Sequence, residues 1–315
     1  MPKSRKRPRP KRRRTKVKLD PLTLERMLQQ IVNAPDAAPP PVVYHYTTWT
    51  AAQGILASQE FWATAHDCMK DKAELGSAND VIVEVANDLR KNATGMPAEA
   101  LALFASGYLA KQVKEVISVC LACFSAARDG DAQWRTYGDY GNGVCLGIKT
   151  LKEPGPQDPP SVLFKVDYSE SSWRCVIKKK FQAICSLLSR AEALPSTLKL
   201  GRWALYQSAA FAAIVAKESK WEVEQEFRQV TLVPHGVQLK KRSVGGEEKK
   251  YWPAVARAGG KRISLSEIII GSNRNAHDTR EQLERVLAAQ GYEDADAEYP
   301  EITVSAILPW SVSKS

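Results

Sequence analysis

Residues 221–233 (WEVEQEFRQVTLV) carry the pattern that decides the fold class, because apolar and charged side chains alternate along much of the stretch. A period of two is typical of a β-strand with one buried face. The apolar members would face a core: Trp221, Val223 and Phe227. The charged members would face the other way: Glu222, Glu224, Glu226 and Arg228. We therefore predict a long strand with two carboxylates, those of Glu224 and Glu226, about 7 Å apart on one face.

Apolar and β-branched runs on both sides of this stretch predict further strands at residues 42–46, 61–64, 116–125, 143–148, 162–168, 263–271 and 301–309. Helical spacing predicts helices at residues 50–56, 75–90, 98–116, 181–190, 198–216 and 278–290. Strands dominate the beginning, middle and end, with a helical block between them. That order predicts an α+β fold with a mixed, largely antiparallel sheet and packed helices, rather than regular βαβ winding.

The positive charge of the chain is concentrated at its N-terminus. Residues 1–18 hold 11 of the 45 Lys and Arg and no acid, which leaves 34 basic against 35 acidic residues elsewhere. We predict that residues 1–19 form a disordered tail. Its cations suit nucleic acid or another polyanion: Arg5, Lys6, Arg7, Arg9, Lys11, Arg12, Arg13 and Arg14. The alternative is a solubilising or targeting tail.

Residues 20–41 form a predicted helix and a linker between the tail and the main domain. Asp20 can cap the helix and Pro21 can occupy its first position. Residues 35–41 (PDAAPPP) predict a stiff linker that separates the helix from a single α+β domain at residues 42–315.

Several functional classes are excluded by composition. No apolar run reaches the roughly 18 residues of a membrane span, and no hydrophobic stretch follows the first positive charges. We therefore expect a cytoplasmic protein with free cysteines and no membrane partner. Cys120 and Cys123 form a CxxC in a strand-like run, which favours core packing over a metal or redox site, and we predict no metal. A P-loop, an HExxH motif, a dinucleotide-binding glycine fingerprint and a GxSxG elbow are all missing.

Three groups of residues are candidates for chemistry. Glu224, Glu226 and Arg228 can place a carboxylate near a glycosidic carbon, where it stabilises an oxocarbenium-like transition state. The alternative is a solvated face of an edge strand.

The second candidate group is Tyr44-His45-Tyr46-Thr47, where His45, Tyr46 and Thr47 can hydrogen-bond ribose hydroxyls. The alternative for His45 is an ordinary structural role. The third group has Ser125 at a strand end and Trp134 and Tyr137 in a loop near glycines, where the rings can stack on nicotinamide or a base. Alternatively, these two rings fill the core.

In this order the motifs YHYT, CFS, WxxYG, GVCLG, WxxExEFR and IIIG resemble a large uncharacterised bacterial and phage family of unknown function, from about residue 42 to residue 309. The first motif and the helix after it also resemble the start of ADP-ribosyltransferases, notably the toxins that modify DNA bases. That resemblance implies NAD as substrate, with His45 on its ribose and Tyr137 or Trp134 on nicotinamide. It also implies Glu226 as the catalytic carboxylate and Glu224 as an acceptor-selecting residue.

We therefore expect an ADP-ribosyltransferase-like enzyme that transfers ADP-ribose from NAD to a nucleic-acid or protein acceptor. The resemblance also suggests a role in toxicity or phage defence. Two alternatives stay open. One is an NAD glycohydrolase or nucleosidase that uses the same carboxylates with water. The other is a non-enzymatic, nucleic-acid-associated binding module in which the Glu-x-Glu-Phe-Arg strand holds a structural ion pair.

Overall fold

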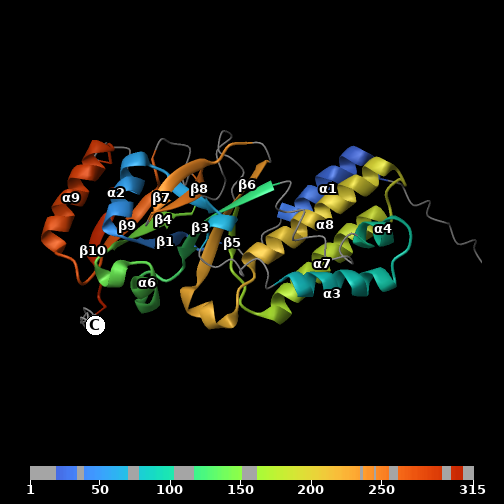
Figure 1. Ribbon diagram of the computed structural model, residues 1–315, viewed down its shortest axis with the longest axis horizontal. Coiled ribbons are helices and arrows are strands. Elements are labelled where there is room, and N and C mark those ends of the chain that lie inside the picture. The colour runs from blue at the N-terminus through green and yellow to red at the C-terminus, as the bar shows by residue number, and fades with distance from the viewer. Residues whose placement is uncertain are drawn as a thin grey trace, which may run out of the picture.

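The computed structural model describes residues 19–33, 39–69, 78–102, 117–150, 162–234, 237–244, 246–254, 262–292 and 299–307. The basic residues expected to contact nucleic acid, Arg5 to Arg14, lie outside the described residues. The molecule is elongated, with the sheet toward one end and a group of helices at the other (Figure 1). None of the helices in the described ranges is long and apolar enough to cross a membrane.

In the described part of the chain, a ten-stranded sheet forms one half of the molecule. Its main path runs β10 (Glu301–Val304), β9 (Leu265–Ile270), β4 (Val144–Lys149), β1 (Val42–Thr47), β3 (Ile117–Ser125), β2 (Phe61–Ala65), β8 (Glu247–Ala254) and β7 (Lys240–Val244). β6 (Glu226–Pro234) pairs with β3 off this path, and β5 (Val162–Lys165) pairs with β6. Every described pair of neighbouring strands is antiparallel except β9 with β10. The predicted mixed, largely antiparallel sheet is confirmed.

β3 is the strand at which the sheet forks. At its C-terminal end Ser125 pairs with Tyr44 of β1. Further back, Leu121 pairs with Thr64 of β2. β6 follows the whole of β3, ending with Ser125 opposite Glu226. One wing, β1–β4–β9–β10, therefore pairs with the C-terminal end of β3, and the other wing, β2–β8–β7, pairs with its middle at Cys120 and Leu121.

The helices cover the sheet in two groups. α1 (Pro21–Asn33), α3 (Asn79–Lys91), α4 (Met96–Ala102), α7 (Glu170–Leu188) and α8 (Pro195–Val215) form a bundle. The bundle shares its core with one face of β3 and β6 through Val119, Leu121 and Val230. α2 (Trp49–Ser58) and α9 (Ala276–Ala289) cover the opposite face of the sheet. The short helix α6 (Asp131–Thr136) places Trp134 against Tyr44 and Tyr46 of β1.

The first helix is part of the bundle rather than a separate unit. Asp20 caps it as predicted, because its carboxylate accepts the backbone N–H of Thr23 at 2.9 Å. Leu24, Leu28 and Val32 recur at the helical period and are buried. α1 therefore packs against α7 and α8, while residues 35–38 of the predicted linker lie outside the described residues.

Apart from the start of β6, two elements differ from the sequence prediction. The hairpin β7–β8 was not predicted, because its strands are rich in charge and lack a continuous apolar face. α7 begins at Glu170 rather than at residue 181, since Trp173 and Ile177 continue the buried stripe toward the N-terminus. Most of the helix expected at residues 98–116 lies outside the described ranges.

Candidate functional site

The chain enters β6 through a turn, and the predicted strand is wrong over its first residues. Ser219–Glu224 form a 3-10 helix, η4, and the strand begins at Glu226. Trp221 and Val223, expected in the core, are 37% and 58% exposed. The Trp221 ring lies instead at the surface, where the Lys217 ammonium is 5.4 Å from its centroid. The alternating pattern therefore predicts the strand correctly only from Glu226 onward.

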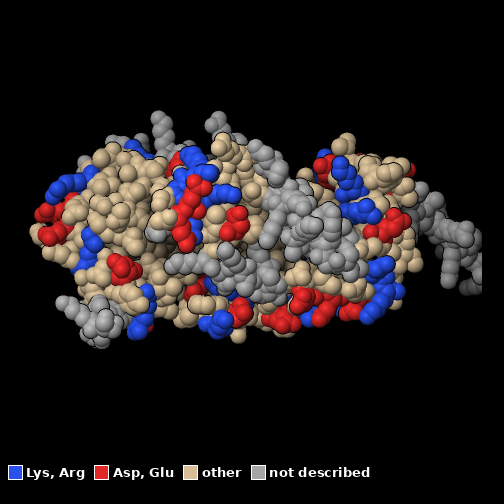
Figure 2. Space-filling view, in the orientation of Figure 1, with Lys and Arg blue, Asp and Glu red and all other residues tan. Residues whose placement is uncertain are grey.

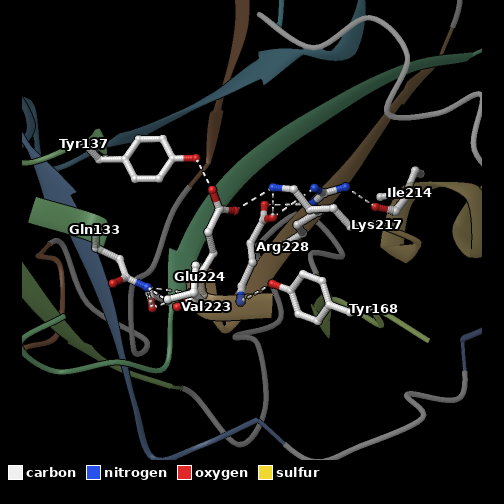
Figure 3. Close-up of polar contacts among 10 residues, drawn as sticks. Gln133, Tyr137, Tyr168, Ile214, Lys217, Val223, Glu224 and Arg228 are labelled. Carbon is white, nitrogen blue, oxygen red and sulfur yellow. Dashed lines mark hydrogen bonds and ion pairs between the residues drawn. The ribbon is translucent and has the colours of Figure 1, made fainter. Parts of the chain in front are cut away.

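Four charged side chains meet where η4, the end of α8 and β6 converge (Figure 3). We call them the ion cluster: Lys217, Glu224, Glu226 and Arg228. Lys217 Nζ lies 2.6 Å from Glu224 Oε2 and 2.9 Å from Glu226 Oε2. Arg228 holds both oxygens of Glu226, with Nε 2.7 Å from Oε1 and Nη2 3.0 Å from Oε2. Its Nη1 donates to the carbonyl of Ile214 at the end of α8.

The ion cluster is buried and electrically balanced. Glu224 is 6%, Glu226 5% and Arg228 0% exposed, so the cluster is not the solvated edge that was the alternative for these residues. Burial by itself raises the pKa of Glu226, but Arg228 and Lys217 outweigh it and lower the pKa from 4.5 to about 2. Burial also opposes the charge on Lys217, yet the two carboxylates prevail and raise its pKa. Both carboxylates therefore have a cation within hydrogen-bonding distance.

Acid should weaken the fold through Glu226. Its pKa is lower in the folded than in the unfolded chain, so it stabilises the fold above about pH 4.5. That stabilisation is lost as the pH falls from about 4.5 toward about 2, and we expect it to amount to about 3 kcal/mol of unfolding free energy. Urea unfolding at several pH values measures it. Glu226→Gln should remove most of the slope in this window, and an unchanged slope in that variant would contradict the assignment.

Glu224 is the member of the ion cluster with a partly exposed partner. Tyr137 donates its hydroxyl to Glu224 Oε1 at 2.9 Å, while the residue as a whole is 48% exposed. Burial of the hydroxyl and the charge of Glu224 raise the pKa of Tyr137. Behind the carboxylate, Gln133 Nε2 donates to the carbonyls of Val223 and Glu224, and Ser125 Oγ donates to the carbonyl of Glu224. These bonds fix α6 and the end of β3 to η4.

Gln225 gives this turn its shape. Its φ of 45° and ψ of 46° lie in the left-handed region, which a non-glycine residue adopts at a cost. The turn lets the side chains of Glu224 and Glu226 converge on Lys217 from a 3-10 helix and a strand, rather than from one strand face. The strained residue thus lies between the two carboxylates.

Gln225→Gly should stabilise the fold by about 0.5 kcal/mol, because the relief of left-handed strain exceeds the extra chain entropy of glycine. The Gln225 side chain is exposed, so little contact is lost. Chemical denaturation measures the change, with Gln225→Ala as a control that keeps the strain and gains nothing. A loss of stability in the glycine variant would show that the turn is not strained.

His45 lies on the opposite face of the sheet from the ion cluster. Tyr44 is opposite Ser125, and Ser125 is opposite Glu226, so these three side chains share a face. His45, the next residue along β1, points the other way, with its ring 5.7 Å from that of Phe124. Its Nδ1 is 3.0 Å from the carbonyl of Cys123, and burial lowers its pKa. The expectation that His45 and Glu226 flank one ligand is not met by this register.

The remaining predicted ligand-binding residues have structural contacts. Trp134 is 0% exposed, its ring meets that of Tyr46 edge-on at 5.0 Å, and its Nε1 donates to Asp129 at 2.6 Å. It therefore fills the core and cannot stack on a ligand as expected. Thr47 is buried at the end of β1, where its carbonyl lies so close to Gly143 that a Cβ there would approach it to 2.1 Å.

Three contributors to the site were not predicted from the sequence. Lys217 follows α8 and has no motif around it. Gln133 and Tyr168 were not predicted either. Tyr168 accepts the backbone N–H of Glu226 at 2.9 Å. The only available signal was composition: two nearby acids that become buried need a cation, and Lys217 and Lys220 precede them.

A metal site receives no support from the described residues, which contain no group of three or more His, Cys, Asp or Glu arranged to hold an ion. Cys120 and Cys123 are not joined in a disulfide. A separation of three residues on β3 turns their side chains to opposite faces, so they cannot chelate together. The chemistry that remains is that of the ion cluster and Tyr137. A ligand that displaced the Tyr137 hydroxyl would meet a fixed carboxylate, that of Glu224.

Residues 133–229 match the model of a family described as a protein of unknown function (DUF2971). The matched range contains the whole ion cluster together with Gln133, Tyr137 and Tyr168, and it excludes β1 with His45. None of the curated proteins and none of the solved structures matches the chain. The match supports the expected likeness to an uncharacterised family, and the likeness to ADP-ribosyltransferases stays a prediction.

Proposed function

We propose that the protein is an ADP-ribosyltransferase-like enzyme. It cleaves the bond between nicotinamide and ribose in NAD and transfers ADP-ribose to a nucleic-acid or protein acceptor. One observation carries the proposal: the buried Glu224 carboxylate is fixed by Lys217 and covered on its outer side by the half-exposed Tyr137. A preorganised anion of this kind stabilises the positive charge that develops on the ribose ring as nicotinamide leaves.

Within this proposal Glu224, rather than Glu226, meets the ribosyl carbon. Both oxygens of Glu226 are held by Arg228, and one of them also by Lys217, so the surrounding cations already neutralise its charge. Glu224 has one oxygen on Lys217 and the other on a phenol that a ligand can replace. Glu226 then acts from behind by holding Lys217 in place. His45 and Trp134 have no direct part.

The proposed reaction balances without a further reagent. The bond between the nicotinamide nitrogen and ribose C1′ breaks, and its electron pair leaves with nicotinamide. The acceptor oxygen or nitrogen bonds to C1′ and releases its proton to water. Tyr137, whose half-exposed ring lies beside Glu224, is placed to stack on the nicotinamide ring once its hydroxyl leaves the carboxylate.

Nicotinamide release from NAD by the purified full chain tests the proposal, with and without added DNA, RNA and cell lysate. Release with ADP-ribose covalently attached to an acceptor supports the transferase. Release with all ADP-ribose free in solution would replace it with an NAD glycohydrolase. No release under any condition, from a protein with cooperative thermal unfolding, would overturn both.

A second candidate is favoured by the completeness of the ion cluster. All four carboxylate oxygens are hydrogen-bonded, and two acids balance two bases, which is the arrangement of a structural ion pair in a binding module. In that case no nicotinamide is released, and the Glu224 and Glu226 variants differ from the wild type in stability alone.

A further inference from the structure

The β7–β8 hairpin concentrates positive charge on an otherwise balanced folded chain. Residues 237–254 hold two acids, Glu247 and Glu248, against five bases: Lys240, Lys241, Arg242, Lys249 and Lys250. β7 lies at the end of the strand order and pairs only with β8 among the described strands. Figure 2 shows Lys and Arg gathered over this hairpin, with acidic side chains beside them.

The strand register divides these cations between two faces. Tyr251 lies opposite Lys240 on one side and Thr64 on the other, while Arg242 lies opposite Lys249. Opposed residues share a face, and alternate residues of one strand do so too. One face therefore carries two aromatic and three basic side chains, together with the carboxylate of Glu247: Trp62, Tyr251, Lys240, Arg242 and Lys249. Lys241 and Lys250 are opposite each other on the reverse face.

The aromatic and basic side chains on this face are in contact. The rings of Trp62 and Tyr251 are 5.1 Å apart and tilted by 42°. The Arg242 guanidinium lies 4.6 Å from the Trp62 centroid and 5.7 Å from that of Tyr251. Its Nη2 donates to Thr64 at 3.2 Å, and no carboxylate among the described residues forms an ion pair with it. Within the described residues, the guanidinium is thus held by two rings and a hydroxyl rather than by a carboxylate.

The other two cations of this face have weak or exposed partners. Lys240 Nζ is 4.0 Å from Glu60, and Lys249 Nζ is 2.7 Å from the largely exposed Glu247. Such surface pairs contribute about 1 kcal/mol or less and are readily exchanged for other anions. Trp62 and Tyr251 are themselves partly exposed. Within the described ranges, no helix packs extensively on β7 or β8.

We propose that this face of β2, β8 and β7 binds single-stranded nucleic acid. Unpaired bases present flat rings that stack on Trp62 and Tyr251, and the phosphates between them meet Lys240, Arg242 and Lys249. A duplex hides its base faces and would engage only the cations. The proposal does not depend on NAD chemistry, since it places a nucleic acid on the wing of the sheet away from the ion cluster.

Strand selectivity tests this site in the full chain, because the cations of the basic N-terminus would attract the phosphates of single strands and duplexes alike. Fluorescence anisotropy compares a labelled single-stranded DNA with a duplex of equal phosphate number. We expect the single strand to bind on the order of tenfold more tightly, as one or two stacked bases provide. Tyr251→Leu should bring the two affinities close together. Trp203→Leu, a partly exposed tryptophan on α8, should leave the ratio unchanged.

A charge-matched pair of variants tests the face itself. Lys240→Glu with Lys249→Glu should weaken single-strand binding more than Lys241→Glu with Lys250→Glu, although both change the net charge equally. Equal losses in the two double variants would overturn the proposal. So would a wild-type protein that does not prefer the single strand, or a Tyr251→Leu protein with unchanged thermal unfolding and an unchanged ratio.

Discussion

Glu224→Gln is expected to lower the rate of nicotinamide release from NAD by about 100-fold or more, the usual effect of removing a preorganised electrostatic stabiliser. Glutamine keeps the shape of the side chain and can still accept a hydrogen bond from Lys217. It loses the negative charge that would face the ribosyl cation. The measurement is single-turnover nicotinamide release by the variant and the wild type at equal concentrations of folded protein.

Glu222→Gln is the matched control, because Glu222 lies on the same η4 turn but is exposed and outside the ion cluster. It should release nicotinamide at the wild-type rate. Tyr137→Phe should keep more activity than Glu224→Gln, since it removes a hydroxyl and leaves both the ring and the carboxylate. Wild-type turnover in Glu224→Gln would exclude this carboxylate from the reaction, whatever the activity of the protein.

The strands of the sheet centre could be predicted because they are buried on both faces. The sequences of β1, β3, β4 and β9 are apolar runs. β3 packs against the helical bundle on one face and against the core beneath α2 and α9 on the other. The β7–β8 hairpin was not predicted because it lies at the sheet edge and carries charged residues on both faces. Its sequence therefore lacks the alternation of apolar and polar residues that predicts a strand. The segment before β6 was wrongly predicted as a strand because its apolar and charged residues alternate. In the structure it forms a 3-10 helix with an exposed tryptophan.

The residues of the candidate site were only partly predictable. Glu224, Glu226 and Arg228 were identified together, but they converge through the left-handed Gln225 and not along one strand face. The role of Lys217 could not be predicted from the sequence, because it depends on where α8 ends relative to β6. The sheet face that His45 occupies depends on strand register. Tyr44 pairs with Ser125, and Ser125 pairs with Glu226. Tyr44 therefore points toward the ion cluster and His45 points away from it.

The ion cluster lies at the junction of the bundle and the sheet. Lys217 follows α8, Arg228 binds the Ile214 carbonyl of α8, and Glu226 is the first residue of β6. Asp167, just after β5, accepts the backbone N–H of Lys217 at 3.1 Å through its carbonyl. A change in the balance of charge here should therefore affect how the two halves of the molecule hold together.

Glu226→Gln is expected to lower the free energy of unfolding at neutral pH by about 3–5 kcal/mol, the usual cost of removing one partner from a buried ion pair. The variant leaves Arg228, which is fully buried, without its bidentate carboxylate. Lys217 keeps Glu224, so the cluster passes from neutral to a net positive charge in a region with little water. Urea unfolding followed by far-UV circular dichroism measures the loss.

Two further variants separate charge from other effects of the substitution. Glu281→Gln removes a carboxylate whose pairs with Arg285 and His277 are exposed on α9, and it should cost less than about 1 kcal/mol. Combining Glu226→Gln with Arg228→Met removes the stranded cation together with its partner and should recover part of the stability lost in the single variant. A loss in Glu226→Gln no larger than that in Glu281→Gln would mean that water or a rearranged side chain compensates Arg228. The ion cluster would then not hold the bundle to the sheet.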